Sequence, residues 1–149
     1  MAFYLGALIT LAFNLQPPLR QNTNTSNKTP TVNIQLYAGE ISGSKYGFGT
    51  SPNNLTSPGL TLRFKITDII NVTVTNVGKM PHAFAVTNTP KTGAAVLFKA
   101  EIASPTNPLQ PGQHGTIIFT PDNAGNFYYI CPVPGHAETG MYGSVIVTG

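Results

Sequence analysis

Three residues whose side chains bind soft metal ions lie close together near the C-terminus. The segment 128–142 reads YYICPVPGHAETGMY, and in it four residues separate Cys131 from His136 and four more separate His136 from Met141. A thiolate, an imidazole and a thioether select copper over magnesium or calcium. The spacing therefore predicts a copper site in this segment.

This segment lacks one ligand of the copper site that its residue types favour. One thiolate and two imidazoles in a trigonal arrangement, with a long axial thioether, form the electron-transfer type of copper site. The second imidazole is expected from His82, which lies in KMPHAFAV between two predicted strands. His114, in the turn PGQHGT, is expected to be exposed and structural.

The residues between the candidate ligands favour a stiff loop. Pro132 and Pro134 restrict the backbone, and Gly135 allows a tight turn before His136. Gly140 is expected to turn the chain again so that Met141 can approach the metal. A stiff loop would hold the ligands in one geometry in both oxidation states.

Composition excludes several functions for this chain of 149 residues, a length that suits one domain. The net charge of +3 comes from scattered residues, which argues against nucleic-acid binding. A single cysteine excludes an intrachain disulfide and a site with two thiolates. Three histidines cannot supply a second, catalytic copper cluster once two are used, so we expect an electron-transfer protein that has no small-molecule substrate and is not an enzyme.

The elements that must position the candidate ligands are β-strands. Apolar residues alternate with polar ones in several segments, and stretches rich in Gly, Pro and Asn separate these segments. The pattern predicts an all-β fold of seven or eight strands, either a sandwich or a Greek-key barrel. The stretch 39–58 shows no such pattern and is predicted to be a surface loop. The expected strands begin at Val32, Leu60, Ile70, Ala83, Thr116, Phe127 and Gly143.

The N-terminal part of the chain differs from the rest. Residues 2–15 form an uncharged, mostly apolar run, so 1–19 is predicted to be a hydrophobic helix that acts as a membrane anchor or targeting segment. A remnant signal peptide and an ordinary core helix are the alternatives. Residues 20–30 are polar and predict a flexible linker, which leaves 31–149 as the folded domain. Four Asn-X-Ser/Thr patterns favour an extracytoplasmic location; they begin at Asn24, Asn27, Asn54 and Asn71.

Two segments resemble the cupredoxin family, most closely its rusticyanin, sulfocyanin and auracyanin branch. They are GLTLRFKITDIINVTVTNVGKMPHAF and GNFYYICPVPGHAETGMYGSVIV. The resemblance implies a cupredoxin-like Greek-key β-sandwich with one type 1 copper ion, bound by the ring nitrogens of His82 and His136, the thiolate of Cys131 and, weakly, Met141. The chain departs from the family at Ala83, where members often carry an Asn or Ser that ties the ligand loops together. We expect backbone N–H groups of Ala83 and Val133 to donate to the sulfur.

This resemblance implies a one-electron carrier that cycles copper between Cu(II) and Cu(I) in an extracytoplasmic respiratory chain. The alternative is a fixed copper-binding subunit of a membrane terminal oxidase or a related complex. Redox partner proteins, such as cytochromes or a terminal oxidase, are expected to dock on the apolar surface around His136. The membrane is the other expected partner, through the N-terminal segment.

Overall fold

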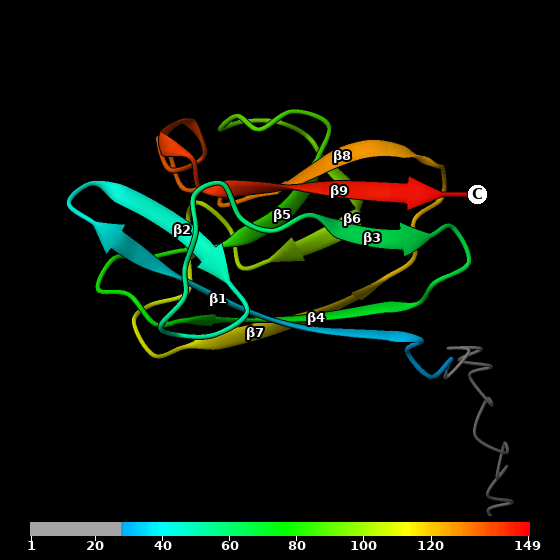
Figure 1. Cartoon of the computed structure of the whole chain (residues 1–149), viewed down its shortest axis with the longest axis horizontal. Helices are drawn as coiled ribbons and strands as arrows, with labels where there is room; N and C mark the ends of the chain where they lie inside the picture. Colours follow the sequence, from blue (N-terminus) through cyan, green and yellow to red (C-terminus); the bar gives the residue numbers. More distant parts are fainter. Residues whose placement is uncertain (1–27) are drawn as a thin grey trace, which may run out of the picture.

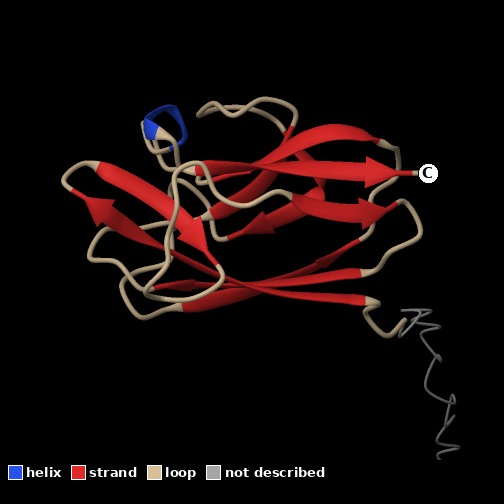
Figure 2. Cartoon of the chain, viewed as in Figure 1, coloured by secondary structure: helices blue, strands red, loops and turns tan. Residues whose placement is uncertain are grey.

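The computed structural model describes residues 28–149, which form two β-sheets packed face to face (Figures 1 and 2). One sheet has the strand order β2-β1-β4-β7, and the other has the order β3-β9-β8-β5-β6. The only helical element described in this range is the single-turn η1, Ala137–Thr139. The strands are β1 Val32–Ser42, β2 Lys45–Gly49, β3 Leu62–Lys65, β4 Ile70–Asn76, β5 Phe84–Thr87, β6 Val96–Ile102, β7 His114–Phe119, β8 Gly125–Ile130 and β9 Tyr142–Thr148.

Alternating side chains explain how the two sheets enclose the core. Along β4, Ile70, Val72 and Val74 are buried, whereas the residues between them are partly exposed. Val145 and Val147 alternate in the same way along β9 in the opposite sheet. Because successive side chains of a strand point to opposite faces, this period places one face of each sheet in the core.

The predicted all-β, cupredoxin-like sandwich is confirmed. The seven expected strands correspond to β1, β3, β4, β5, β7, β8 and β9. The described residues form nine strands rather than the predicted seven or eight. The two strands that were not expected are β2 and β6. Strand β6 lies at the edge of its sheet and pairs only with β5, across a register shift.

The prediction of a surface loop over 39–58 is wrong for its first half. Strand β1 continues through this stretch to Ser42 and turns back into β2, with Tyr37 opposite Gly49. Phe48 is fully buried, and its backbone pairs with Thr56. The sequence pattern did not predict β2 because this strand has only five residues. Two of them are glycines, a residue type that is depleted in strands.

Strand pairing brings the two candidate ligand segments to one end of the molecule. Strands β5 and β8 are antiparallel neighbours, with Ala85 opposite Ile130. His82 comes just before β5 and Cys131 just after β8, so the register places their backbones side by side. Residues 49 positions apart in the chain thereby meet at the edge of the core.

The anchor or targeting segment predicted over 1–19 lies outside the described residues, as does most of the linker predicted over 20–30. In the part of the chain that is described, no helix has the length and apolar character needed to cross a membrane. The boundaries of these two segments and of the domain at 31–149 stay predictions.

Candidate metal centre

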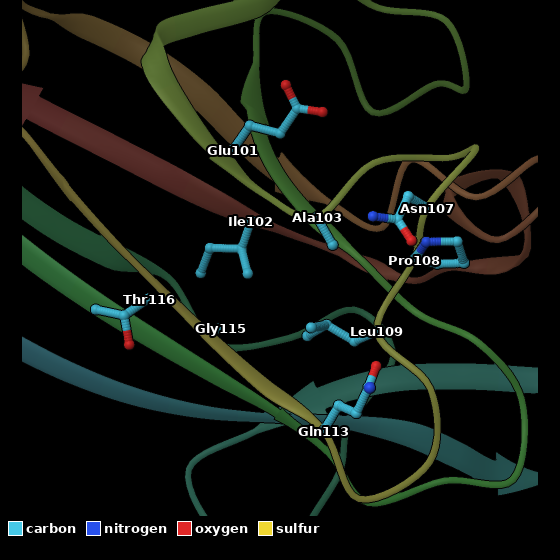
Figure 3. A pocket seen from close by; sticks show the side chains of 9 residues that line it. All are labelled: Glu101, Ile102, Ala103, Asn107, Pro108, Leu109, Gln113, Gly115 and Thr116. Atoms are coloured by element: carbon cyan, nitrogen blue, oxygen red, sulfur yellow. The ribbon is translucent and has the colours of Figure 1, made fainter.

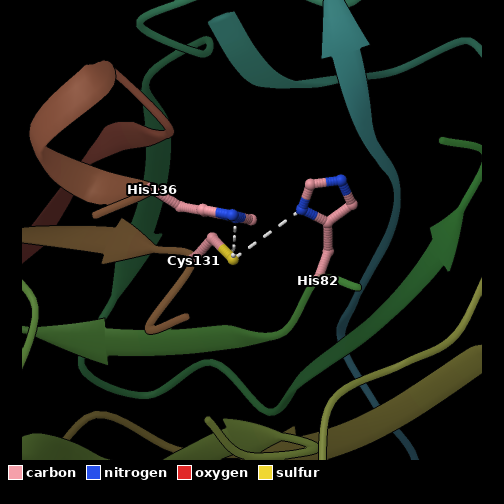
Figure 4. Close-up of side chains that lie close together, drawn as sticks. All are labelled: His82, Cys131 and His136. Carbon is pink, nitrogen blue, oxygen red and sulfur yellow. Dashed lines mark hydrogen bonds between the residues drawn. The ribbon is translucent and has the colours of Figure 1, made fainter. Parts of the chain in front are cut away.

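The side chains of His82, Cys131 and His136 converge at the end of the sandwich where β5 begins and β8 ends (Figure 4). Their potential ligand atoms all lie within 4.8 Å of one another. The Cys131 Sγ is 3.5 Å from Nδ1 of His136 and 3.9 Å from Nδ1 of His82. Both imidazoles therefore turn the same ring nitrogen toward the sulfur, which leaves Nε2 of each pointing away from it.

Backbone hydrogen bonds close the segment 131–141 into a compact loop. The amide of His136 donates to the carbonyl of Val133 (3.1 Å), and the amide of Met141 donates to the carbonyl of His136 (3.0 Å). The amide of Cys131 donates to the carbonyl of Met141 (3.0 Å). This loop joins β8 to β9, so both of its ends are held in one sheet.

Two glycines allow the turns of this loop, as expected. Gly135 and Gly140 have φ values of 84° and 103°, which residues with a Cβ atom rarely adopt. A Cβ atom at Gly140 would also collide with the Ser57 hydroxyl, which donates to the Gly140 carbonyl (3.0 Å). Met141 follows this turn and is fully buried in the same core cluster as Cys131.

The Cys131 thiol is buried and accepts hydrogen bonds from the backbone. Burial raises the pKa of Cys131 to about 11, although backbone N–H groups of Ala83 and Val133 act in the opposite direction. The Ala83 N–H lies 3.4 Å from Sγ. The donor expected from Ala83 is therefore present, and the Val133 N–H favours the thiolate in the same way. A metal ion that binds here must displace the thiol proton, because the thiolate is the ligand.

The two imidazoles are held in their neutral form near pH 7. Burial, with a further contribution from the nearby His136, lowers the pKa of His82 to about 4. Burial also lowers the pKa of His136. A neutral imidazole has a free nitrogen lone pair, so both rings are available as metal ligands. His82 is fully buried, whereas His136 keeps 7% of its surface exposed.

Two further residues touch the site, and both come from the stretch that was predicted to be a surface loop. The ring of Tyr46 stacks on His136, with centroids 4.2 Å apart. A carboxylate oxygen of Glu40 lies 3.4 Å from Nε2 of His82. Burial acts to raise the pKa of Glu40, but hydrogen bonds from backbone N–H groups lower it overall. The aromatic residues Tyr46 and Phe48 lie two positions apart, and this spacing is the sequence feature that could have indicated a strand here.

A side-chain network ties the ligand loop to the loop before β6. The Thr92 amide and hydroxyl donate to the two carboxylate oxygens of Glu138, at 2.7 and 2.8 Å. The Thr92 hydroxyl also accepts from the amide of Gly135 at 3.1 Å. Ala83 has no polar side chain with which to tie the ligand loops together. The Thr92–Glu138 contact braces the loop of His136 from another direction.

The third histidine and a cavity between two strands lie apart from this cluster. His114 is exposed, as predicted, and begins β7. A cavity of about 370 Å³ lies between β6 and β7, where Glu101, Leu109 and Gln113 are among the residues lining it (Figure 3). None of the candidate ligands lines this cavity. Leu109 connects it to the site through the backbone, since its amide donates to the His82 carbonyl (2.7 Å).

The donor chemistry of the cluster fits copper. One thiol and two imidazoles lie close enough together to share one ion, and Met141 supplies a buried thioether from the same loop. A second thiolate, which binuclear copper or tetrahedral sulfur sites need, does not exist in the chain.

Comparisons with known proteins agree with this chemistry. The family model described as multicopper oxidase (Cu-oxidase_2) matches residues 12–149. Rusticyanin of Acidithiobacillus ferridurans is 36% identical over 83 residues, which are 52% of this chain and 44% of that protein. A second rusticyanin, of Acidithiobacillus ferrooxidans, is also 36% identical over 83 residues, which are 54% of its length. The chain thus spans about half the length of the curated relatives it matches.

Solved structures show the same fold. Auracyanin B superposes with a TM-score of 0.58 at 20% identity, over 83% of this chain and 93% of auracyanin B. The multicopper oxidase mgLAC superposes with a TM-score of 0.60 at 23% identity, over 78% of this chain but only 38% of the oxidase. The chain thus belongs to the Cu-oxidase_2 family, and its similarity to rusticyanin and its fold identify it as a cupredoxin whose cluster of one thiol and two imidazoles suits one type 1 copper ion.

Proposed function

We propose that this cupredoxin is a one-electron carrier whose copper is bound by His82, Cys131, His136 and Met141. The observation that carries the proposal is the convergence of a buried thiol and two neutral imidazoles within 4.8 Å. When bound, copper alternates between Cu(II) and Cu(I) and so stores one electron. The described residues would supply one thiolate, two imidazole nitrogens and one axial thioether, which is the ligand set of electron-transfer copper sites.

The surroundings of the site support electron transfer rather than substrate chemistry. His82, Cys131 and Met141 are fully buried. Backbone hydrogen bonds close the ligand loop, and Thr92 holds it from outside through its contacts with Glu138. An electron carrier needs ligands that move little between its two oxidation states, and side chains packed in a dense core are restrained in this way.

The surface next to His136 supports a transient docking site for a redox partner. Met80 is 45% exposed, and Pro134 is exposed in the ligand loop itself. These apolar residues come from the two segments that hold His82 and His136. A small apolar patch allows weak association and fast release, as redox encounters require. Because part of His136 is exposed, its ring would be the part of the site nearest to a docked partner.

The proposed setting is an extracytoplasmic respiratory chain, with the protein attached to the membrane through its N-terminal segment. The apolar run over 2–15 supports this attachment. The alternative is a fixed subunit of a terminal oxidase or a related membrane complex. Gentle detergent extraction from source membranes distinguishes them: a mobile carrier is recovered alone, whereas a fixed subunit copurifies with haem-containing subunits.

Spectroscopy of the copper-loaded protein tests the proposed ligands and function together. The oxidised protein is expected to show an intense visible thiolate-to-copper band, to lose it on uptake of one electron, and to regain it on reoxidation. Cys131→Ser removes the thiolate and should abolish the band. The matched control is His114→Gln, which changes a histidine outside the cluster and should keep the band. A band that survives in Cys131→Ser contradicts the ligand assignment.

A further inference from the structure

The carboxylate of Glu40 joins strand β1 to the segment that carries His82. One of its oxygens lies 3.4 Å from Nε2 of His82 and also accepts the amide of Met80 at 2.8 Å. The other accepts the amide of Lys79 at 2.7 Å. The side chain of Glu40 is 24% exposed, whereas that of His82 is fully buried. One acidic side chain therefore contacts the imidazole and the backbone of the two residues before Pro81.

Gly78 leaves room for the Glu40 carboxylate because it has no side chain. A Cβ atom at Gly78 would collide with the Glu40 carboxylate. The amide of Gly78 donates to the side-chain oxygen of Asn76 (2.9 Å), and the side-chain nitrogen of Asn76 donates to the carbonyl of Met80 (2.8 Å). The buried Asn76 thus holds residues 78–80 in a curve around the carboxylate, independently of Glu40.

The contact favours one position for the proton on the His82 ring. A neutral imidazole has one N–H and one lone pair, and an ionised carboxylate can only accept hydrogen bonds. Glu40 therefore favours the form of His82 with its proton on Nε2. The lone pair is then on Nδ1, the nitrogen that faces the sulfur of Cys131 at 3.9 Å. Carboxylates commonly orient metal-binding histidines through their outer nitrogen in this way.

We propose that Glu40 is a positioning residue that presents Nδ1 of His82 to the copper and, through its negative charge, stabilises Cu(II) relative to Cu(I). This inference rests on the proposed function, because it takes His82 as a copper ligand. The distance of 3.4 Å is long for a neutral hydrogen bond, which is commonly about 2.9 Å. Metal bound at Nδ1 would draw electron density from the ring and make Nε2–H a stronger donor to the carboxylate.

The first experiment measures the ring nitrogens of His82 by ¹⁵N NMR in the metal-free protein at neutral pH. The wild type is expected to show His82 with its proton on Nε2. Glu40→Leu removes the acceptor and should shift the ring toward a mixture of the two tautomers. If the His82 signals of Glu40→Leu match those of the wild type, the orienting role is wrong. This readout does not depend on copper, so it remains decisive even if the proposed ligands or the electron-carrier function fail.

The second experiment measures the charge effect in the copper-loaded protein by redox titration. Glu40→Gln keeps an oxygen acceptor of similar shape but removes the negative charge, and it should raise the reduction potential. Asp122→Asn is the matched control, because it removes one charge from the turn before β8, at the opposite end of that strand from Cys131. Equal potentials in Glu40→Gln, Asp122→Asn and the wild type would overturn the charge effect.

Copper affinity distinguishes positioning from a purely structural role of Glu40. Loss of the partner of a metal-binding histidine typically lowers metal affinity about 10- to 100-fold. Glu40→Leu should show a loss of this size in competition with a copper chelator, and Glu40→Gln a smaller one. A structural role alone would lower the stability of Glu40→Leu but leave its His82 tautomer, and the copper affinity and potential of Glu40→Gln, at wild-type values, which would contradict the proposal.

Discussion

The ring of Tyr46 stacks on the imidazole of His136, with centroids 4.2 Å apart and an angle of 23° between the planes. The same ring meets His82 edge-on at 5.6 Å. Tyr46 lies on β2, and the hairpin formed by β1 and β2 carries it to the site. One aromatic side chain thus covers both imidazoles and limits the exposure of His136 to 7%.

Removing this ring should destabilise the protein and expose the site. We expect Tyr46→Ala to lower the free energy of unfolding by about 2 kcal/mol, because it removes an aromatic pair and part of the packing around it. It should also speed copper loss to a chelator, since water gains access to His136. Urea denaturation and the rate of bleaching of the visible band measure the two effects. Tyr46→Phe keeps the ring and should resemble the wild type; equal losses in both variants would show that stacking is not the cause.

Replacing the proposed axial ligand should change the reduction potential without removing the colour. Met141→Gln supplies an oxygen in place of the thioether, and oxygen favours Cu(II), so the potential should fall. The variant should also lose about 1–3 kcal/mol of stability, because Met141 is fully buried and the amide would lack partners. Redox titration followed at the visible band measures the shift. Met80→Gln, at an exposed methionine, is the control; an unchanged or raised potential in Met141→Gln argues against an axial role.

The network between Thr92 and Glu138 should stabilise the ligand loop. Thr92→Val removes a hydroxyl that donates to Glu138 and accepts from the amide of Gly135. We expect a loss of about 1–2 kcal/mol and faster hydrogen exchange at the Gly135 amide, which would be left without its acceptor. Thr89→Val changes an exposed threonine of the same loop and serves as the control. Unchanged exchange at Gly135 in Thr92→Val would show that the network does not restrain the loop.

The metal-free protein should lose stability in mild acid. Burial, together with the nearby His136, lowers the pKa of His82 from 6.5 to about 4. Between these values the unfolded chain binds a proton that the folded protein does not, so the free energy of unfolding should decrease as the pH falls from about 6.5 to about 4. The contribution of His82 is about 3 kcal/mol, and the lowered pKa of His136 acts in the same direction.

Urea denaturation of the metal-free protein at pH 7 and pH 4 measures this dependence on pH. His82→Gln should show a weaker dependence than the wild type, whereas His114→Gln should keep it in full. If His82→Gln loses as much stability between the two pH values as the wild type does, another group causes the effect.

The sequence by itself determined the type of fold and one half of the site. The alternating residues of β4 and β9 indicate strands because the period of two is a local property of a half-buried sheet. The spacing of Cys131, His136 and Met141 is equally local, since one loop carries all three residues. Residue type then points to copper, because thiolate, imidazole and thioether together suit few other metals.

Only the tertiary structure decided what surrounds this loop. His82 and Cys131 are 49 residues apart and meet because β5 pairs with β8 in a particular register. Glu40 reaches His82 from 42 residues away, on a part of β1 and its hairpin that the hydrophobic pattern did not reveal. Local periodicity shows which face of a strand is buried, but it carries no information about which strand becomes the neighbour. The partners of the two imidazoles therefore follow from strand pairing, which depends on the packing of the whole core.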